Sequence, residues 1–208
     1  MHIEARKNGL IPRGFRPLIG AEKEAVRINI YEPLLIPGLL QTEEYARLVL
    51  SVGLQSDKLE ELVSIRMERQ VLLSREDPPW IFLLIREAVI RDLRPEVRVG
   101  QCKRLLELMD NPKFSVQVLP ADALVFHPTG YQVLSFRRQQ DIAYMEGTAG
   151  NAQMLTDSDV VRQLAVLFDV VRSEAFSAKD SANVIQSIME LREYRRSIVS
   201  VLAQELPQ

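Results

Sequence analysis

The sequence predicts an α+β fold, a mixed and largely antiparallel sheet of about four to five strands that is covered by helices and followed by a helical C-terminal part. Two observations support this prediction. Helical stripes of apolar residues, opened by capping residues or a proline, lie between strand-like segments and after the last of them. The strand-like segments are short and either alternating or continuously apolar, and they occur at residues 27–31, 80–85, 114–119, 131–136 and 141–146.

The N-terminal residues 1–14 include glycines and a proline, and we expect them to form a flexible or docking tail. Residues 15–208 then form a single α+β domain, whose part at 156–208 is helical. With 47% hydrophobic residues, a chain of 208 residues can bury a sizeable core. A short helix near 17–26 leads into the first strand.

An apolar run punctuated by prolines follows the first strand, at residues 31–41. Two prolines and a glycine lie within six residues, which excludes a regular helix or an inner strand. The run must therefore lie extended against something apolar, either the protein's own core or a ligand. Thr42 is an N-cap for the next helix, and Glu43 and Glu44 stand in its first turn, where the helix dipole favours acids.

The middle of the chain alternates between helices and strands. A longer helix opens at Ser56 and ends at the Asp-Pro-Pro sequence of residues 77–79. The continuous apolar run at 80–85 predicts a buried central strand. Pro95 suits the first turn of another helix, which runs to residues 111–112.

The last third begins with strands and ends with helices. Segments 131–136 and 141–146 predict an antiparallel hairpin, because only a short charged segment joins them. Capping residues at 156–159 and 177–180 open two C-terminal helices, and the second runs past Arg196.

Composition limits the function classes. The formal net charge of −2 argues against non-specific phosphate binding as the main function, because such binding needs a concentrated basic surface. The single cysteine, Cys102, excludes an internal disulfide and fits a reducing cytoplasm. No apolar run reaches the roughly 18 to 20 residues that span a bilayer, and the N-terminus lacks an apolar signal core. We expect a cytoplasmic protein that makes no membrane contact.

Metal and nucleotide motifs are missing from the sequence. The two histidines, His2 and His127, and the single cysteine show no paired spacing of a zinc site. The segment 147–150 is too short for a phosphate-binding loop and lacks a lysine, so it is either a tight turn or a set of amides that faces an anion. We expect neither a metal nor a cofactor.

His127 lies in a loop that leads into a predicted strand, and two interpretations of it stay open. It could carry a proton or donate a hydrogen bond to a ligand, or it could satisfy backbone groups at a turn. Glu87 and Glu146 each end an apolar segment and face either water or the mouth of a pocket. If these three residues converge, they form a polar corner in an apolar pocket, the usual form of a small-molecule site.

The segment 31–47 resembles the opening of the uncharacterised, antitoxin-like C-terminal domain of actinobacterial helix-turn-helix regulators of the xenobiotic-response-element type. The similarity covers roughly residues 14–195. The resemblance implies a domain that senses a ligand or binds a small acidic partner protein, while an N-terminal helix-turn-helix contacts DNA. Only about 13 residues precede the similar region, so we expect no direct sequence-specific DNA binding. Further similar segments follow in order at residues 66–70, 77–79, 87–91, 105–108, 116–120, 127–128, 133–136 and 144–147.

Three functional hypotheses follow. The first is a regulator-type domain that binds a hydrophobic small molecule or a small partner protein. The alternative is a cofactor-independent biosynthetic enzyme, cyclase-like, acting on a hydrophobic small molecule in the same pocket with His127, Glu87 and Glu146 as catalytic groups. The third is an interaction module that forms a homodimer through its C-terminal helices. The expected ligand-binding residues are Tyr31, Glu32, Leu35, Trp80, His127, Tyr131 and Tyr144.

Overall fold

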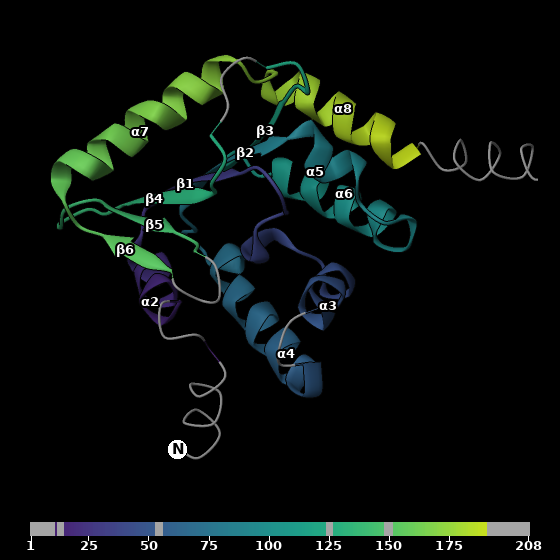
Figure 1. The fold of residues 1–208 in the computed structure, drawn as a ribbon, viewed down its shortest axis with the longest axis horizontal. Helices are drawn as coiled ribbons and strands as arrows, with labels where there is room; N and C mark the ends of the chain where they lie inside the picture. The colour runs from purple at the N-terminus through teal and green to yellow at the C-terminus, as the bar shows by residue number, and fades with distance from the viewer. Residues whose placement is uncertain (1–10, 12–14, 53–55, 124–126, 148–151, 191–208) are drawn as a thin grey trace, which may run out of the picture.

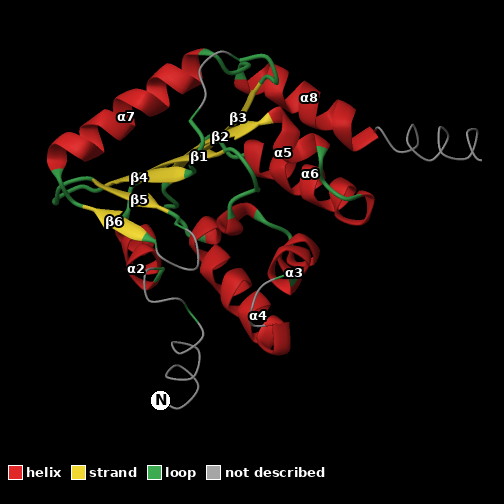
Figure 2. Ribbon diagram, viewed as in Figure 1, coloured by secondary structure: helices red, strands yellow, loops and turns green. Residues whose placement is uncertain are grey.

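The computed structural model describes residues 11, 15–52, 56–123, 127–147 and 152–190. These residues form one six-stranded sheet with helices on both faces (Figures 1 and 2). The strands are β1 (Arg27–Glu32), β2 (Trp80–Arg86), β3 (Phe114–Leu119), β4 (Tyr131–Ser135), β5 (Ile142–Met145) and β6 (Gln153–Leu155). The helices are α2 (Arg16–Glu24), α3 (Glu43–Ser51), α4 (Leu59–Arg69), α5 (Glu87–Arg91), α6 (Pro95–Met109), α7 (Ser158–Ser173) and α8 (Ala178–Glu190).

The predicted α+β class is confirmed, and so is the β4–β5 hairpin. The strand order is β3-β2-β1-β4-β5-β6. The β1–β2 and β2–β3 pairs are parallel and are joined by helical crossovers, whereas the pairs from β1–β4 to β5–β6 are antiparallel. The sheet has a sixth strand beyond the expected four to five, since β6 is only three residues long and too short to show an alternating pattern.

Strand pleating divides the buried residues between two faces. One face, here called the crossover face, carries Ile28 and Ile30 of β1 and packs against α2, α3, α5, α6 and α8. The opposite face, here called the α7 face, carries Tyr31 and Tyr131 and packs against Phe168 of α7. In Figure 2, α7 runs over the sheet on the side away from α2 and α4. Successive residues of a strand point to opposite faces, so the two faces have separate cores.

The proline-rich segment after β1 lies partly in the crossover core. Ile36, Leu39 and Leu40 are buried, and residues 38–40 form a 3₁₀ turn, whereas Leu34 and Leu35 are exposed. A chain that pairs with no strand needs other partners for its backbone groups, and three glutamine side chains provide them. Gln41 Nε2 donates to Ile36 O (2.7 Å), Gln70 Nε2 to Gly38 O (3.1 Å) and Gln41 O (2.7 Å), and Gln101 Nε2 to Leu40 O (2.9 Å), while Gln101 Oε1 accepts from Thr42 N (2.8 Å).

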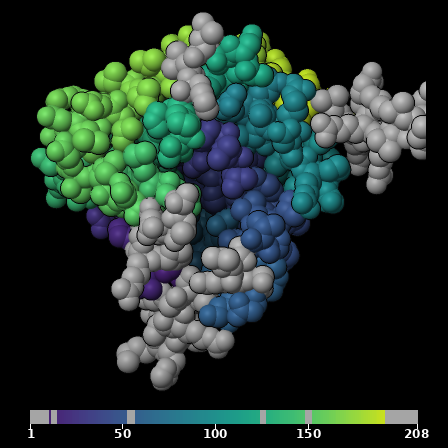
Figure 3. Space-filling model, in the orientation of Figure 1, coloured from purple at the N-terminus to yellow at the C-terminus, as the bar shows by residue number. Residues whose placement is uncertain are grey.

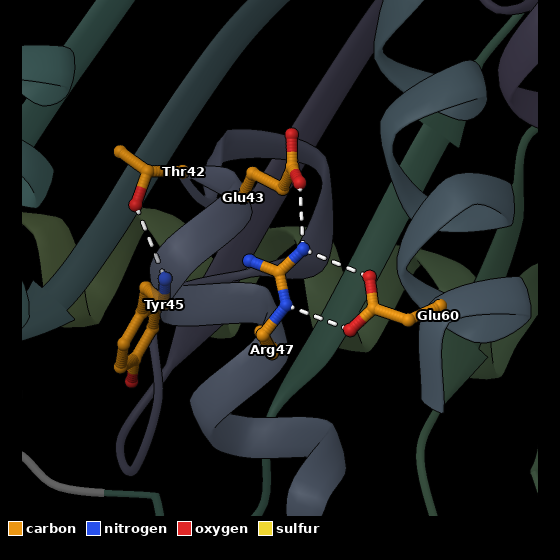
Figure 4. A network of polar contacts seen from close by, with 5 residues as sticks. All are labelled: Thr42, Glu43, Tyr45, Arg47 and Glu60. Atoms are coloured by element: carbon orange, nitrogen blue, oxygen red, sulfur yellow. Dashed lines mark hydrogen bonds and ion pairs between the residues drawn. The ribbon is translucent and has the colours of Figure 1, made fainter. Parts of the chain in front are cut away.

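Helix α3 begins as predicted. Thr42 Oγ1 accepts a hydrogen bond from Tyr45 N at 3.2 Å. Arg47 of α3 donates to Glu43 in the same helix and to Glu60 of α4, which ties the two helices together at the surface (Figure 4). The next helix was expected to open at Ser56, but residues 56–58 form a 3₁₀ turn and α4 itself begins at Leu59.

Three other expectations change or lie outside the described residues. Trp80 was expected in a buried strand, but its side chain is 46% exposed, because it is the first residue of β2 and lies at the end of the α7 face. Glu87 is the first residue of the short helix α5. This helix was not predicted, because five residues are too few to show a helical pattern. Helix α8 is described to Glu190, and its expected continuation past Arg196 lies outside the described residues, as do residues 1–10 and 12–14 of the tail.

Candidate functional site

A cavity of about 430 Å³ opens on the crossover face, at the end of the sheet where β1 and β5 stop and β4 starts. In Figure 3 the segment after β1, in indigo, reaches the surface near the middle of the view, between the green strands and the blue helices. The walls come from that segment, α3, α4 and these strand ends. The lining residues are Phe15, Glu32, Pro33, Leu34, Leu35, Ile36, Pro37, Gly38, Gln41, Val49, Arg66, Arg69, Pro128, Thr129, Gly130, Gln132, Tyr144, Glu146 and Gly147.

Glu32, the last residue of β1, places its carboxyl group in the cavity wall. A Cβ atom on Gly130 would lie 2.6 Å from Glu32 Oε2, so the absence of a side chain at residue 130 makes room for this carboxyl group. Burial and the neighbouring Glu146 carboxylate raise the pKa of Glu32 to about 8. Glu32 is therefore predominantly protonated at neutral pH in the folded protein, and it can act as a hydrogen-bond donor or release its proton to a suitable partner.

Two arginines of α4 lie on the other side of the cavity. Arg66 Nη1 donates to Gln41 Oε1 at 2.8 Å, and burial together with the nearby Arg69 lowers the pKa of Arg66 to about 10. Arg69 forms a buried, two-point ion pair with Glu22 of α2, in which Nε donates to Oε2 at 2.5 Å and Nη2 donates to Oε1. This pair neutralises Arg69 and closes the floor between α2 and α4.

Two buried polar side chains in the wall have no hydrogen-bond partner among the described residues. Gln132 and Tyr144 are cross-strand neighbours in β4 and β5, and they are 7% and 2% exposed. Neither Gln132 Oε1 nor the Tyr144 hydroxyl has a protein partner there. An unsatisfied buried polar group costs roughly 1 to 3 kcal/mol, so a ligand that bonded to these atoms would recover part of that free energy.

Three of the expected site residues lie together on the other face of the sheet. The rings of Tyr31, Tyr131 and His127 pack with centroids 5.6 to 6.4 Å apart, beneath α7. The Tyr31 hydroxyl donates to His127 O at 2.8 Å, and His127 Nδ1 lies 2.8 Å from Thr129 O. His127 thus makes the backbone contacts of a turn, and its ring packs in the aromatic cluster of the α7 face.

The remaining expected residues divide between the cavity and other places. Glu32, Leu35, Tyr144 and Glu146 all line the cavity. Trp80 lies at the opposite end of the sheet from the cavity, because it starts the strand β2 that runs parallel to β1, and its ring stacks on Phe82.

Glu87 stands at the start of α5 and forms an ion pair with Arg91 there. Of the three groups expected to converge for catalysis, the structure places only Glu146 in the cavity wall.

Sequence analysis did not select Gln41, Arg66 and Gln132 as site residues. The segment 66–70 carried a signal, since Arg66, Arg69 and Gln70 are three and four residues apart and therefore share one side of α4. Gln132 carried another, because it is a polar residue inside an otherwise apolar strand.

The described residues form an α+β fold with a cavity at one end of its sheet. Residues 15–187 match the family described as a domain of unknown function, DUF5753, and the chain belongs to that family. No curated protein and no solved structure matches the chain. Within the part of the chain that the structure describes, no helix has the length and apolar character needed to cross a membrane, and no group of three or more His, Cys, Asp or Glu residues is placed to hold a metal ion.

Proposed function

We propose that this protein binds an amphipathic small molecule in the crossover-face cavity and acts as a ligand-sensing regulatory domain. The observation that carries the proposal is the pair of buried, unpartnered polar atoms, Gln132 Oε1 and Tyr144 Oη, in the wall of a cavity of about 430 Å³. Small-molecule sites are typically concave, mostly apolar, and furnished with a few converging polar groups.

The apolar part of the cavity supports the same proposal. Leu34 is 76% exposed and Leu35 is 46% exposed, and both lie beside the opening. Exposed apolar side chains at the rim of a polar cavity suit a ligand with a polar end and an apolar body. The three glutamine side chains bond to the backbone that follows these two residues, from Ile36 to Gln41, and so hold this part of the segment in place.

The regulatory role rests on the resemblance of the segment 31–47 to the C-terminal domains of helix-turn-helix regulators. In this proposal the domain acts in the cytoplasm and signals ligand binding to a partner protein or to a second copy of itself. A small acidic partner protein in place of a small molecule is the competing outcome of the experiment below.

A second candidate is a cofactor-independent enzyme, and one observation favours it. Glu32 is a cavity carboxyl group whose pKa of about 8 suits a general acid at neutral pH. Because His127 and Glu87 do not line the cavity, an enzymatic version of the proposal would rely on Glu32 and Glu146 instead.

Native mass spectrometry of the protein purified from its own host tests the proposal. We expect a bound small molecule, released on denaturation, that the variant Leu35→Trp fails to retain because the indole blocks the opening. Val166→Trp is the matched control, since Val166 is 57% exposed and lies on α7, outside the cavity lining. A bound polypeptide would favour the partner-protein hypothesis, and equal retention by both variants would contradict binding in this cavity.

A further inference from the structure

The strand-end wall of the cavity offers hydrogen-bond acceptors beside the unpartnered Tyr144 hydroxyl. Gln132 Oε1 has no hydrogen-bond partner among the residues that the structure describes, and the carboxyl groups of Glu32 and Glu146 line the same cavity. On the α4 side, Arg69 is paired with Glu22, and Arg66 Nη1 donates to Gln41 Oε1. A ligand with its own N–H donors would satisfy the acceptors of the strand-end wall.

The charges of the cavity also favour a ligand that carries hydrogen-bond donors. Glu22 neutralises Arg69 in a pair whose side chains are 1% and 8% exposed. Once both Glu32 and Glu146 are ionised, two carboxylates therefore face the single guanidinium of Arg66. Repulsion between the two carboxylates is one cause of the raised pKa of Glu32, after burial. A positive group between the carboxylates would replace this repulsion by attraction.

We propose that the ligand is an organic cation with an apolar body: its ammonium or amidinium group binds between Glu32 and Glu146 and donates to Gln132 Oε1, and its apolar body lies against Leu34, Leu35 and Val49. This inference rests on the proposed function, because it names the chemical class of the molecule that the same cavity takes. The glycine at residue 130 contributes by leaving the Glu32 carboxyl group its position at the strand end.

Three probes that share one apolar chain test the charge of the ligand: n-octylamine, n-octanol and n-octanoate. Binding is measured by isothermal titration calorimetry with the whole chain near neutral pH. We expect the amine to bind about tenfold more tightly than the alcohol, because charge-assisted hydrogen bonds are roughly twice as strong as neutral ones, and octanoate to bind least. Octanoate binding most tightly would overturn the proposal.

Two variants place the effect on particular residues. Glu32→Gln should weaken amine binding far more than octanol binding and so remove the preference for the amine, a pattern that general damage to the fold would not produce. Arg66→Gln should leave amine binding intact or strengthen it. Unchanged amine affinity in Glu32→Gln, or loss of amine binding in Arg66→Gln, would contradict the proposal.

The failure of this inference can be told apart from the failure of the proposed function. If octanol or octanoate binds best and Leu35→Trp blocks that binding, the cavity is a ligand site and only the cationic class is wrong. If none of the probes binds, the cationic class is also wrong. Native mass spectrometry then tests the proposed function separately, by showing whether a copurified molecule occupies the cavity.

Discussion

The two faces of the sheet differ most at the end where β1 stops. On the α7 face, Tyr31 and Tyr131 pack 5.7 Å apart in a closed aromatic cluster. On the crossover face, Glu32 and Gln132, each only one residue further along the same strands, line a cavity. A single step along a strand thus separates a residue that stabilises the fold from a residue that is available to a ligand.

The covering elements explain this difference. On the α7 face one long helix lies directly on the sheet and fills the space with Phe168 and Val171, which are fully buried. On the crossover face the proline-rich run after β1, α4 and the strand ends enclose a cavity, and polar side chains line it. At this end of the sheet, the α7 face stabilises the fold through packing. The crossover face carries polar groups in its cavity wall that have no hydrogen-bond partner among the described residues.

The largest effect should come from the buried ion pair beneath the cavity. Arg69→Met leaves the Glu22 carboxylate buried without its partner, and we expect the free energy of unfolding to fall by about 4 kcal/mol. Arg47→Met is the control, because it removes an exposed ion-pair cluster (Figure 4) and should cost much less. Urea denaturation measures both, and equal losses would contradict a buried, structural role for Glu22 and Arg69.

The pH dependence of stability should separate Glu32 from ordinary surface acids. Between its usual pKa and about 8, the folded protein holds a proton on Glu32 that the unfolded chain releases, so stability from this group falls as pH rises through that window. Glu32→Gln removes the penalty. After allowance for partial solvation, we expect the variant to gain about 2 kcal/mol near pH 9 and almost nothing near pH 4.

The groups that face Glu32 set the size of this effect. Tyr144 on β5, Glu146 directly after β5, and Arg66 and Arg69 on α4 all line the same cavity. Glu60→Gln provides a contrast of opposite sign: hydrogen bonds from Arg47 lower the pKa of Glu60, so this variant should lose stability at neutral pH and recover it in acid. A Glu32→Gln profile parallel to that of the wild type would show that the Glu32 carboxyl group is fully solvated.

The smallest effects should come from the two tyrosine hydroxyls of the α7 face. Tyr31→Phe removes a donor to His127 O and should cost about 1 kcal/mol. Tyr131→Phe removes a hydroxyl that has no partner among the described residues, so it should be neutral or slightly stabilising. Thermal unfolding of the two variants checks the order, and a larger loss for Tyr131→Phe would contradict it.

Local patterns predicted most of the fold. The strands at 114–119 and 131–136, the Thr42 cap and the helix that opens at Pro95 all follow from alternation or capping within a few residues. Elements of three and five residues, such as β6 and α5, hold too little pattern to be recognised. The 3₁₀ turn before α4 depends on packing that the local sequence does not encode.

The candidate site was harder to predict than the fold. The alternation of side chains along a strand does, however, predict which of the candidate residues can share a cavity. Tyr31 and Glu32 are consecutive in one strand, so they cannot both line one cavity, and the same holds for Tyr131 and Gln132. Arg66 reaches the cavity only because α4 packs beside the proline-rich run, and that long-range contact has no local signature.

Carbon-detected NMR titration of the Glu32 carboxyl group is the most direct test of the difference between the two faces. We predict an apparent pKa of about 8 in the free protein and a clear decrease when n-octylamine is added, because a bound cation stabilises the carboxylate. A value near 4.5, the ordinary pKa of a glutamate, that n-octylamine leaves unchanged would show a solvated carboxyl group and would contradict a ligand site at the end of β1.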